Sequence, residues 1–294
     1  SMPGKFALKI CPDILARVRL PQHVIAVTGS NGKTSTVEMI AAILRAGGKT
    51  VVYNEEGSNQ IEGVTTLVLT HATMSGRVRA DVLLIESDER YAAQSFRYFH
   101  PTEFVITNLY RDQLTRNGHP EWVYDAILPA LHPETELLLN ADDPLSSCFA
   151  QGHDKVKWFG LDRCPTDTEA PTGMYHDGAY CPVCHAPMEY DYVHYNHIGA
   201  FRCTKCGHRK PATDYTATAL DLERGTLTID GSVTIQLAFR SIYNVYNVLA
   251  AYAACRECGV ASDTAAGVIN NYILKNGRMQ KFTPVSYTHL TLPT

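Results

Sequence analysis

The stretch VTGSNGKTST, residues 27–36, decides the fold of this 294-residue chain. It completes a short β-branched apolar run, HVIAVTG at 23–29, which has the composition of a buried strand. It opens a run at 34–48 whose apolar residues recur at helical spacing and which stops at two glycines. A strand, a glycine-rich turn and a helix in this order aim backbone N–H groups at a phosphate. We therefore predict a nucleotide phosphate loop.

Two side chains of this loop carry its expected chemistry. Lys33 is placed to contact the β- and γ-phosphates, and the hydroxyl of Thr34 is placed to bind Mg²⁺. The spacing Gly-x-x-Gly-Lys-Thr is shorter than the general Gly-x4-Gly-Lys-Ser/Thr pattern, which it matches only in part. The alternative is a surface turn with a solvated lysine. The other predicted nucleotide-binding residues of the loop are Gly29, Ser30, Asn31, Gly32 and Ser35.

A magnesium–nucleotide site needs a second anchor, usually an acid at the end of a neighbouring strand. The sequence LLIESDER offers Glu86, Asp88 and Glu89 where the apolar run of 82–85 ends. Glu86 lies closest to the strand end, and we predict that it binds the metal directly or through water. The alternative is a solvated acidic loop.

The rest of the chain alternates between the two kinds of element. Apolar, β-branched runs predict strands at 49–54, 80–87, 103–108 and 136–143, and helical spacing predicts a helix at 121–131. Such alternation is typical of a doubly wound parallel sheet, so the predicted fold class is α/β. Residues 216–239 predict a small added β segment with a turn at Asp230-Gly231, and helices are predicted at 243–260 and 262–273.

Composition narrows the class of protein further. No run approaches the eighteen apolar residues of a membrane span. Nine cysteines, an odd number, favour a reducing cytoplasm over a disulfide framework. The formal net charge of −4 provides no basic surface for nucleic acid, so a small-molecule or protein partner fits better.

Four of the cysteines have the spacing of a metal site. The two Cys-x-x-Cys pairs are separated by eighteen residues, which is the spacing of a zinc ribbon. Four thiolates make a closed tetrahedral site, so a structural Zn²⁺ is expected rather than a catalytic one. Iron in place of zinc, or four free thiols, are the alternatives. The predicted ligands are Cys181, Cys184, Cys203 and Cys206, in an insertion at about 164–212.

Five motifs in order resemble those of the Mur ligase family, which includes the folylpolyglutamate synthases. They are TGSNGKTST in the phosphate loop, ITNLYRDQLTRNG at 106–118, LNADDP at 139–144, YNVYNVLAA at 243–251 and GRMQKF at 277–282. The resemblance implies a Mur ligase central ATP-binding domain over residues 23–282, after a lead-in at 1–22.

The resemblance also implies roles for particular residues. Asn247 would contact adenine with Asn244 nearby, and Arg278 would reach the terminal phosphate. Lys33, Glu86 and Arg278 are then the expected catalytic residues. The expected cofactors are ATP and Mg²⁺, with structural Zn²⁺ in the insertion.

Three departures from the classical ligases point to one branch of the family. Gln113 stands where those ligases carry a metal-binding histidine, and residues 117–154 contain no lysine that could be carbamylated. The phosphate loop begins so early in the sequence that we expect no UDP-binding domain before it. With the four cysteines, these features resemble the synthetase subunits of lipid II isoglutaminyl synthase.

That branch implies an ATP-dependent amide ligase of peptidoglycan synthesis. It would activate the α-carboxylate of D-glutamate in the lipid II stem peptide, and ammonia from a GatD-type glutaminase subunit would complete D-isoglutamine. The implied location is the cytoplasm, at the inner face of the membrane through the lipid substrate. Another Mur or folylpolyglutamate synthase-like ligase is the first alternative, and a zinc-ribbon nucleic-acid-binding ATPase is the second.

The end of the chain departs from this family. The resemblance implies a smaller C-terminal domain that docks the glutaminase, and the chain stops soon after GRMQKF, so we expect that domain to be missing. The final residues VSYTHLTLPT resemble a translated synthetic adapter, and we expect residues 283–294 to be non-native. A short terminal strand is the alternative.

Overall fold

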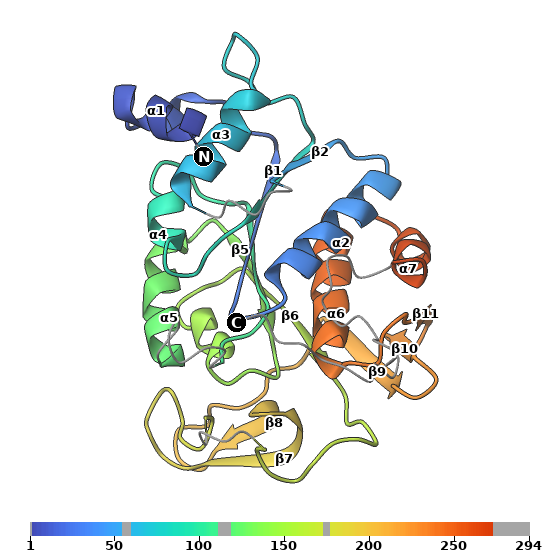
Figure 1. Cartoon of the computed structure of the whole chain (residues 1–294). Helices are drawn as coiled ribbons and strands as arrows, with labels where there is room; N and C mark the ends of the chain where they lie inside the picture. Colours follow the sequence, from blue (N-terminus) through green and yellow to red (C-terminus); the bar gives the residue numbers. More distant parts are fainter. Residues whose placement is uncertain (1, 55–59, 111–118, 173–176, 273–294) are drawn as a thin grey trace, which may run out of the picture.

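A central nine-stranded sheet organises the protein in the computed structural model (Figure 1), which describes residues 2–54, 60–110, 119–172 and 177–272. The strand order is β11-β10-β9-β6-β5-β4-β1-β3-β2. All pairings from β2 to β9 are parallel, and β9, β10 and β11 pair antiparallel. The strands are β1 His23–Thr28, β2 Val51–Tyr53, β3 Val82–Glu86, β4 Glu103–Ile106, β5 Glu136–Asn140, β6 Val156–Leu161, β9 Tyr215–Asp221, β10 Thr226–Ile229 and β11 Val233–Gln236. The α/β fold class is confirmed.

Helices cover both faces of the sheet, because its strands are apolar on both sides. In β1, Ile25 and Val27 enter one core while Val24 and Ala26 enter the other. The first core is closed by α2 Lys33–Ala46, α6 Ile242–Glu257 and α7 Ser262–Asn270. The second is closed by α3 Ile61–Thr70, α4 Ala92–Ser95 and α5 Pro120–Ile127. The architecture is therefore a three-layer sandwich (Figure 1).

The residues that precede β1 pack on the second face of this sandwich. They form α1 Met2–Ile10 and the short helix η1 Ile14–Arg17. The N–H of Gly4 donates to Thr66 Oγ1 in α3 at 2.8 Å, and a Cβ at Gly4 would collide with the backbone of Glu62. Close approach of α1 to α3 thus requires a glycine at this position.

A separate two-stranded β hairpin lies below the central sheet (Figure 1), and the four cysteines lie near the ends of its strands. Its strands are β7 Met188–Tyr195 and β8 Ile198–Cys203, which pair antiparallel. We call residues 177–210 the cysteine segment. It rests on η3 Ser146–Ala150, which follows β5, and His208 Nε2 lies 2.9 Å from the carbonyl oxygen of Pro144.

The local predictions agree with the structure where the hydrophobic period is clear. All the predicted strands and helices exist, and Asp230-Gly231 forms the predicted turn, with φ of 51° and 67°. The sequence patterns predicted no strand for β6, β7 or β8 and no helix for α1, α3 or α4. Gln113, Arg278, the GRMQKF segment and the tail at 283–294 lie outside the described residues.

Candidate active site

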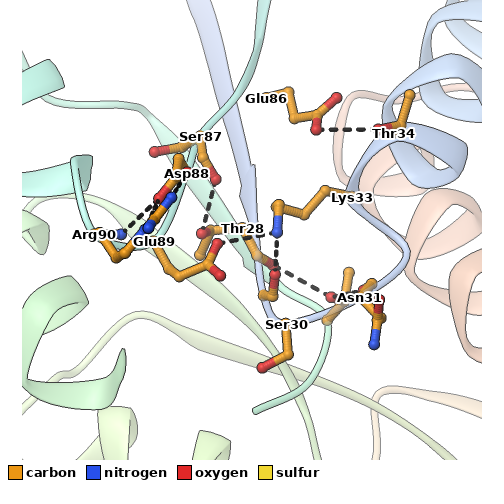
Figure 2. Close-up of polar contacts among 12 residues, drawn as sticks. Thr28, Ser30, Asn31, Lys33, Thr34, Glu86, Ser87, Asp88, Glu89 and Arg90 are labelled. Carbon is orange, nitrogen blue, oxygen red and sulfur yellow. Dashed lines mark hydrogen bonds and ion pairs between the residues drawn. The ribbon is translucent and has the colours of Figure 1, made fainter. Parts of the chain in front are cut away.

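The phosphate loop joins β1 to α2 as predicted, and its lysine is held by two contacts (Figure 2). Lys33 Nζ donates to the carbonyl oxygen of Gly29 at 2.6 Å and lies 3.0 Å from Glu89 Oε2. Both side chains of this ion pair are largely buried, at 16% and 5% exposure. The lysine is therefore fixed at the mouth of the loop by a carboxylate that a phosphate could replace.

The two predicted magnesium ligands lie together beside this lysine (Figure 2). The hydroxyl of Thr34 donates to Glu86 Oε1 at 3.0 Å. The parallel pairing of β1 with β3 places Glu86 opposite Val27, immediately before the loop begins. A hydroxyl and a carboxylate are the hard oxygen donors that Mg²⁺ prefers, so these two residues fit that ion.

Residues 107–110, which follow β4, hydrogen-bond the phosphate loop and support it. The sequence patterns did not predict this role. The N–H of Ser30 donates to the carbonyl oxygen of Asn108 at 2.9 Å, and the N–H of Asn31 donates to Asn108 Oδ1 at 3.1 Å. Thr107 Oγ1 donates to the carbonyl oxygen of Asn31 at 2.9 Å, and Asn31 Nδ2 donates to the Tyr110 hydroxyl at 2.8 Å. The adjacent Thr107 and Asn108 in ITNLY are the sequence feature from which this supporting role could have been predicted.

Helix α6 closes the loop from the other side through its two asparagines. Asn247 is buried, and its Nδ2 donates to Asn244 Oδ1 at 3.1 Å. A Cβ at Gly32 would collide with the Asn247 carboxamide, and Gly32 has a φ of +85°. Gly32 is therefore required both by its left-handed backbone and by this contact. The contact with adenine stays a prediction.

A second polar cluster, the Asp142 cluster, joins the cysteine segment to the sheet. Asp142 follows β5 and is completely buried. Its carboxylate lies 2.6 Å from Lys210 Nζ and accepts a hydrogen bond from the Tyr246 hydroxyl at 2.7 Å. The N–H of Leu161 donates to it at 2.7 Å, and His194 Nε2 lies 3.9 Å away. Burial opposes the charge on Lys210, but Asp142 outweighs it, so the pKa of Lys210 is raised.

The sequence patterns did not predict this cluster, although Asp142 lies within the motif LNADDP. The adjacent Asp143 accepts the N–H groups of Leu109, Leu145 and Ser146 and so ties the ends of β4 and β5 together. Burial raises the pKa of Asp143. The two aspartates therefore fix the C-terminal edge of the sheet, where ligands of parallel sheets bind.

The four predicted metal ligands converge on one point. The Sγ atoms of Cys181, Cys184, Cys203 and Cys206 all lie within 4.8 Å of one another. The Sγ of Cys181 is 3.6 Å from that of Cys206, and the Sγ of Cys184 is 3.5 Å from that of Cys203. A tetrahedral zinc site with 2.3 Å bonds separates its sulfurs by about 3.8 Å. Hydrogen bonds from the N–H groups of Cys206 and Lys205 lower the pKa of the Cys203 thiol to about 6, which favours its thiolate, whereas burial raises the pKa of the Cys181 thiol to about 12.

Comparison with known proteins assigns the class. Residues 27–171 match the model of the Mur ligase middle domain. The fold agrees: a pseudomurein peptide ligase type C from Methanothermus fervidus superposes over 91% of this chain and 53% of its own, with a TM-score of 0.74 at 24% identity. Residues 27–171 are therefore a Mur ligase middle domain, as the motifs predict.

Among the curated relatives, two of the more similar ones are ligase subunits of one kind. The chain is 30% identical over 284 residues to the MurT subunit of lipid II isoglutaminyl synthase (glutamine-hydrolyzing) from Staphylococcus aureus strain COL. It is 34% identical over 273 residues to the MurT subunit from Streptococcus pneumoniae. These matches cover 96% and 89% of this chain, but only 63% and 59% of the relatives. No helix within the described residues is long and apolar enough to cross a membrane.

Proposed function

We propose that this chain is the ATP-dependent synthetase part of a MurT-type amide ligase. The observation that carries this proposal is the pairing of Thr34 with Glu86 beside Lys33, on a phosphate loop within a Mur ligase middle domain. The loop N–H groups and Lys33 would hold the nucleotide phosphates, and Thr34 and Glu86 would hold Mg²⁺, which neutralises phosphate charge.

The proposed reaction uses a carboxylate of the acceptor as nucleophile. The carboxylate oxygen attacks the γ-phosphorus, the bond to the β-phosphate oxygen breaks, and ADP leaves. Ammonia then attacks the acyl carbon of the mixed anhydride, phosphate leaves with the C–O electron pair, and the surplus proton passes to solvent. Lys33 neutralises charge on the transferring group, and the same role is proposed for Arg278.

The names of the relatives suggest the substrate and the partner. We propose that the carboxylate is the α-carboxyl of D-glutamate in the lipid II stem peptide, presented at the membrane surface, and that a GatD-type glutaminase subunit supplies the ammonia. We further propose that residues 23–282 form one ATP-binding domain and that Asn247 and Asn244 line its adenine site.

We propose a supporting role for the metal. The four sulfurs are within tetrahedral distance of each other and fit one Zn²⁺ without leaving an open coordination position. The ion would hold together the two ends of the β7–β8 hairpin. Metal analysis of the purified chain should find about one zinc per chain, and Cys181→Ser with Cys203→Ser should abolish it.

The direct test is an amidation assay of the product of the full-length gene, which would include the domain that docks the glutaminase, with the glutaminase, glutamine, ATP and lipid II. Mass spectrometry should show conversion of one carboxyl to an amide together with ADP release. Lys33→Ala should lose at least about a hundredfold in rate. Lys157→Ala is the matched control, because Lys157 pairs with Asp214 at the surface and should leave the rate unchanged. ADP release without amide formation would reject the proposed substrate and reaction.

A further inference from the structure

Helix α1 carries a row of exposed apolar side chains. Met2, Phe6 and Ile10 are 81%, 67% and 69% exposed and follow one another at i, i+4 spacing. Residues four apart lie on the same face of a helix, so the three side chains form one row, which we call the α1 row. Gly4, which packs on α3, lies about half a turn from Met2 and from Phe6, so the row faces away from α3. A contiguous apolar row that faces away from the core marks an interaction surface.

Two lysines border the α1 row. Lys5 and Lys9 are exposed and directly precede Phe6 and Ile10 in the sequence. Neither lysine makes an ion pair with any residue that the structure describes. α1 itself contains no acidic residue that could neutralise them. The helix therefore presents an apolar row beside two positive charges, which is the pattern of helices that lie on anionic membranes.

The loop between α3 and β3 adds positive charge at the same end of the molecule. Arg19, which follows η1, forms a parallel β-bridge with Arg77 of this loop, and its N–H donates to the carbonyl oxygen of Gly76 at 2.8 Å. The side chains of Arg19, Arg77 and Arg79 are exposed and make no ion pair within the described part of the chain. Met74, in the turn of the loop, is fully exposed. Figure 1 shows this loop and α1 both at the upper end of the molecule.

The acidic side chains that lie next to these cations in the sequence are engaged by protein groups. Asp13 forms an ion pair with Arg17 at 2.9 Å. Asp81 accepts hydrogen bonds from the N–H and the hydroxyl of Thr50, both at 2.7 Å. The whole chain has a formal net charge of −4, so a cationic end orients it toward an anionic surface.

We propose that α1 and the loop between α3 and β3 dock the protein on an anionic lipid surface. The α1 row enters the boundary between headgroups and acyl chains, and Lys5 and Lys9 pair with lipid phosphates. The stems of the lysines stay beside the apolar row while their ammonium groups reach the phosphates. Because α1 is already held on α3 through Gly4, little ordering is needed on binding.

Docking in this way leaves the nucleotide site accessible. The loop between α3 and β3 enters the sheet at its N-terminal edge, whereas the phosphate loop leaves β1 at the C-terminal edge. The two surfaces therefore lie at opposite edges of the sheet. The inference goes beyond the proposed reaction, because it concerns where the protein is held and requires neither ATP nor an acceptor.

The test is sedimentation of the full-length protein with vesicles of phosphatidylcholine alone or with about one third phosphatidylglycerol. Binding to the anionic vesicles should be at least about tenfold stronger. Phe6→Gln with Ile10→Gln should weaken that binding at least about tenfold, because the apolar row is lost. Lys5→Gln with Lys9→Gln should remove most of the preference for anionic lipid. All four positions are exposed, so the urea midpoints of both variants should stay unchanged.

Matched controls remove similar side chains outside this surface. Trp122→Gln changes an aromatic residue of α5 that is 66% exposed, and Lys155→Gln with Lys157→Gln changes two exposed lysines. Both controls should bind vesicles as the unmodified protein does.

Three results would overturn the proposal. They are equal binding to the two kinds of vesicle, anionic binding that survives loss of the α1 row, and self-association through Phe6 and Ile10 without vesicle binding. Failure of the proposed function looks different: vesicle binding and its dependence on α1 persist, but no ATP-dependent amide forms.

Discussion

Two lysine–carboxylate pairs of nearly equal burial occur in this protein and have different surroundings. Lys33 pairs with Glu89 at 3.0 Å, and Lys210 pairs with Asp142 at 2.6 Å. Each lysine side chain is 16% exposed. Asp142 also accepts hydrogen bonds from Tyr246 and from the Leu161 N–H, whereas Lys33 donates to the backbone of its own loop.

The difference shows how the same pair of groups can serve binding or structure. The Asp142 pair joins segments that are far apart in the sequence and is surrounded by protein donors. A buried pair of this kind stabilises little by itself, but removing one partner leaves an uncompensated charge. The Lys33 pair lies on a phosphate loop, where an incoming phosphate can take the place of Glu89.

The largest effect is expected for Asp142→Asn. The change leaves the Lys210 ammonium without its carboxylate in a buried site, and we expect a loss of about 3–5 kcal/mol in the free energy of unfolding. Urea denaturation measures it, with Asp191→Asn, an exposed change on β7, as the control. A loss below about 1 kcal/mol would show that the Asp142 cluster does not hold the cysteine segment.

A smaller and reversible effect is expected for Glu89→Gln. The free energy of unfolding should fall by about 1–3 kcal/mol without nucleotide, because Lys33 loses a charged partner. Saturating Mg·ATP should restore much of this loss, because phosphate replaces the carboxylate. The same nucleotide should not rescue Asp142→Asn, and equal rescue of both variants would remove the distinction between the pairs.

The smallest effect concerns Glu103, a buried carboxylate that pairs with no lysine among the described residues. Burial raises the pKa of Glu103 well above its ordinary 4.5, with Glu136 and Glu257 adding to the shift. The folded state therefore holds a proton that the unfolded state releases, and stability falls as the pH rises above 4.5 toward the raised pKa.

Glu103→Gln should remove this contribution. From pH 5 to pH 8, the urea concentration at the unfolding midpoint should fall less for the variant than for the unmodified protein. Glu134→Gln, an exposed change, should keep the unmodified pH dependence. An unchanged pH dependence in Glu103→Gln would mean that the carboxylate is ionised in the folded state.

Local patterns allowed much of the sheet and the phosphate loop to be predicted, since residues 27–36 are contiguous and their order dictates their geometry. Glu86 could be placed because it ends an apolar run. The Asp142 cluster could not be predicted, because Asp142, His194, Lys210 and Tyr246 meet only through the tertiary fold. The β7–β8 hairpin was not predicted, although Met188, Tyr190 and Tyr192 alternate with Glu189 and Asp191 in β7. This short run lies in a region rich in glycine, proline, tyrosine and histidine around the four cysteines, which obscured its pattern.

The most direct test of the distinction between the two pairs is the shift in unfolding midpoint caused by Mg·ATP in two matched variants. At a hundredfold excess over the dissociation constant, binding should stabilise the unmodified protein by about 2.7 kcal/mol. Lys210→Met should lower stability but keep this shift, and Lys33→Met should lose the shift. A full shift in Lys33→Met would contradict the assignment of the phosphate loop as the nucleotide site.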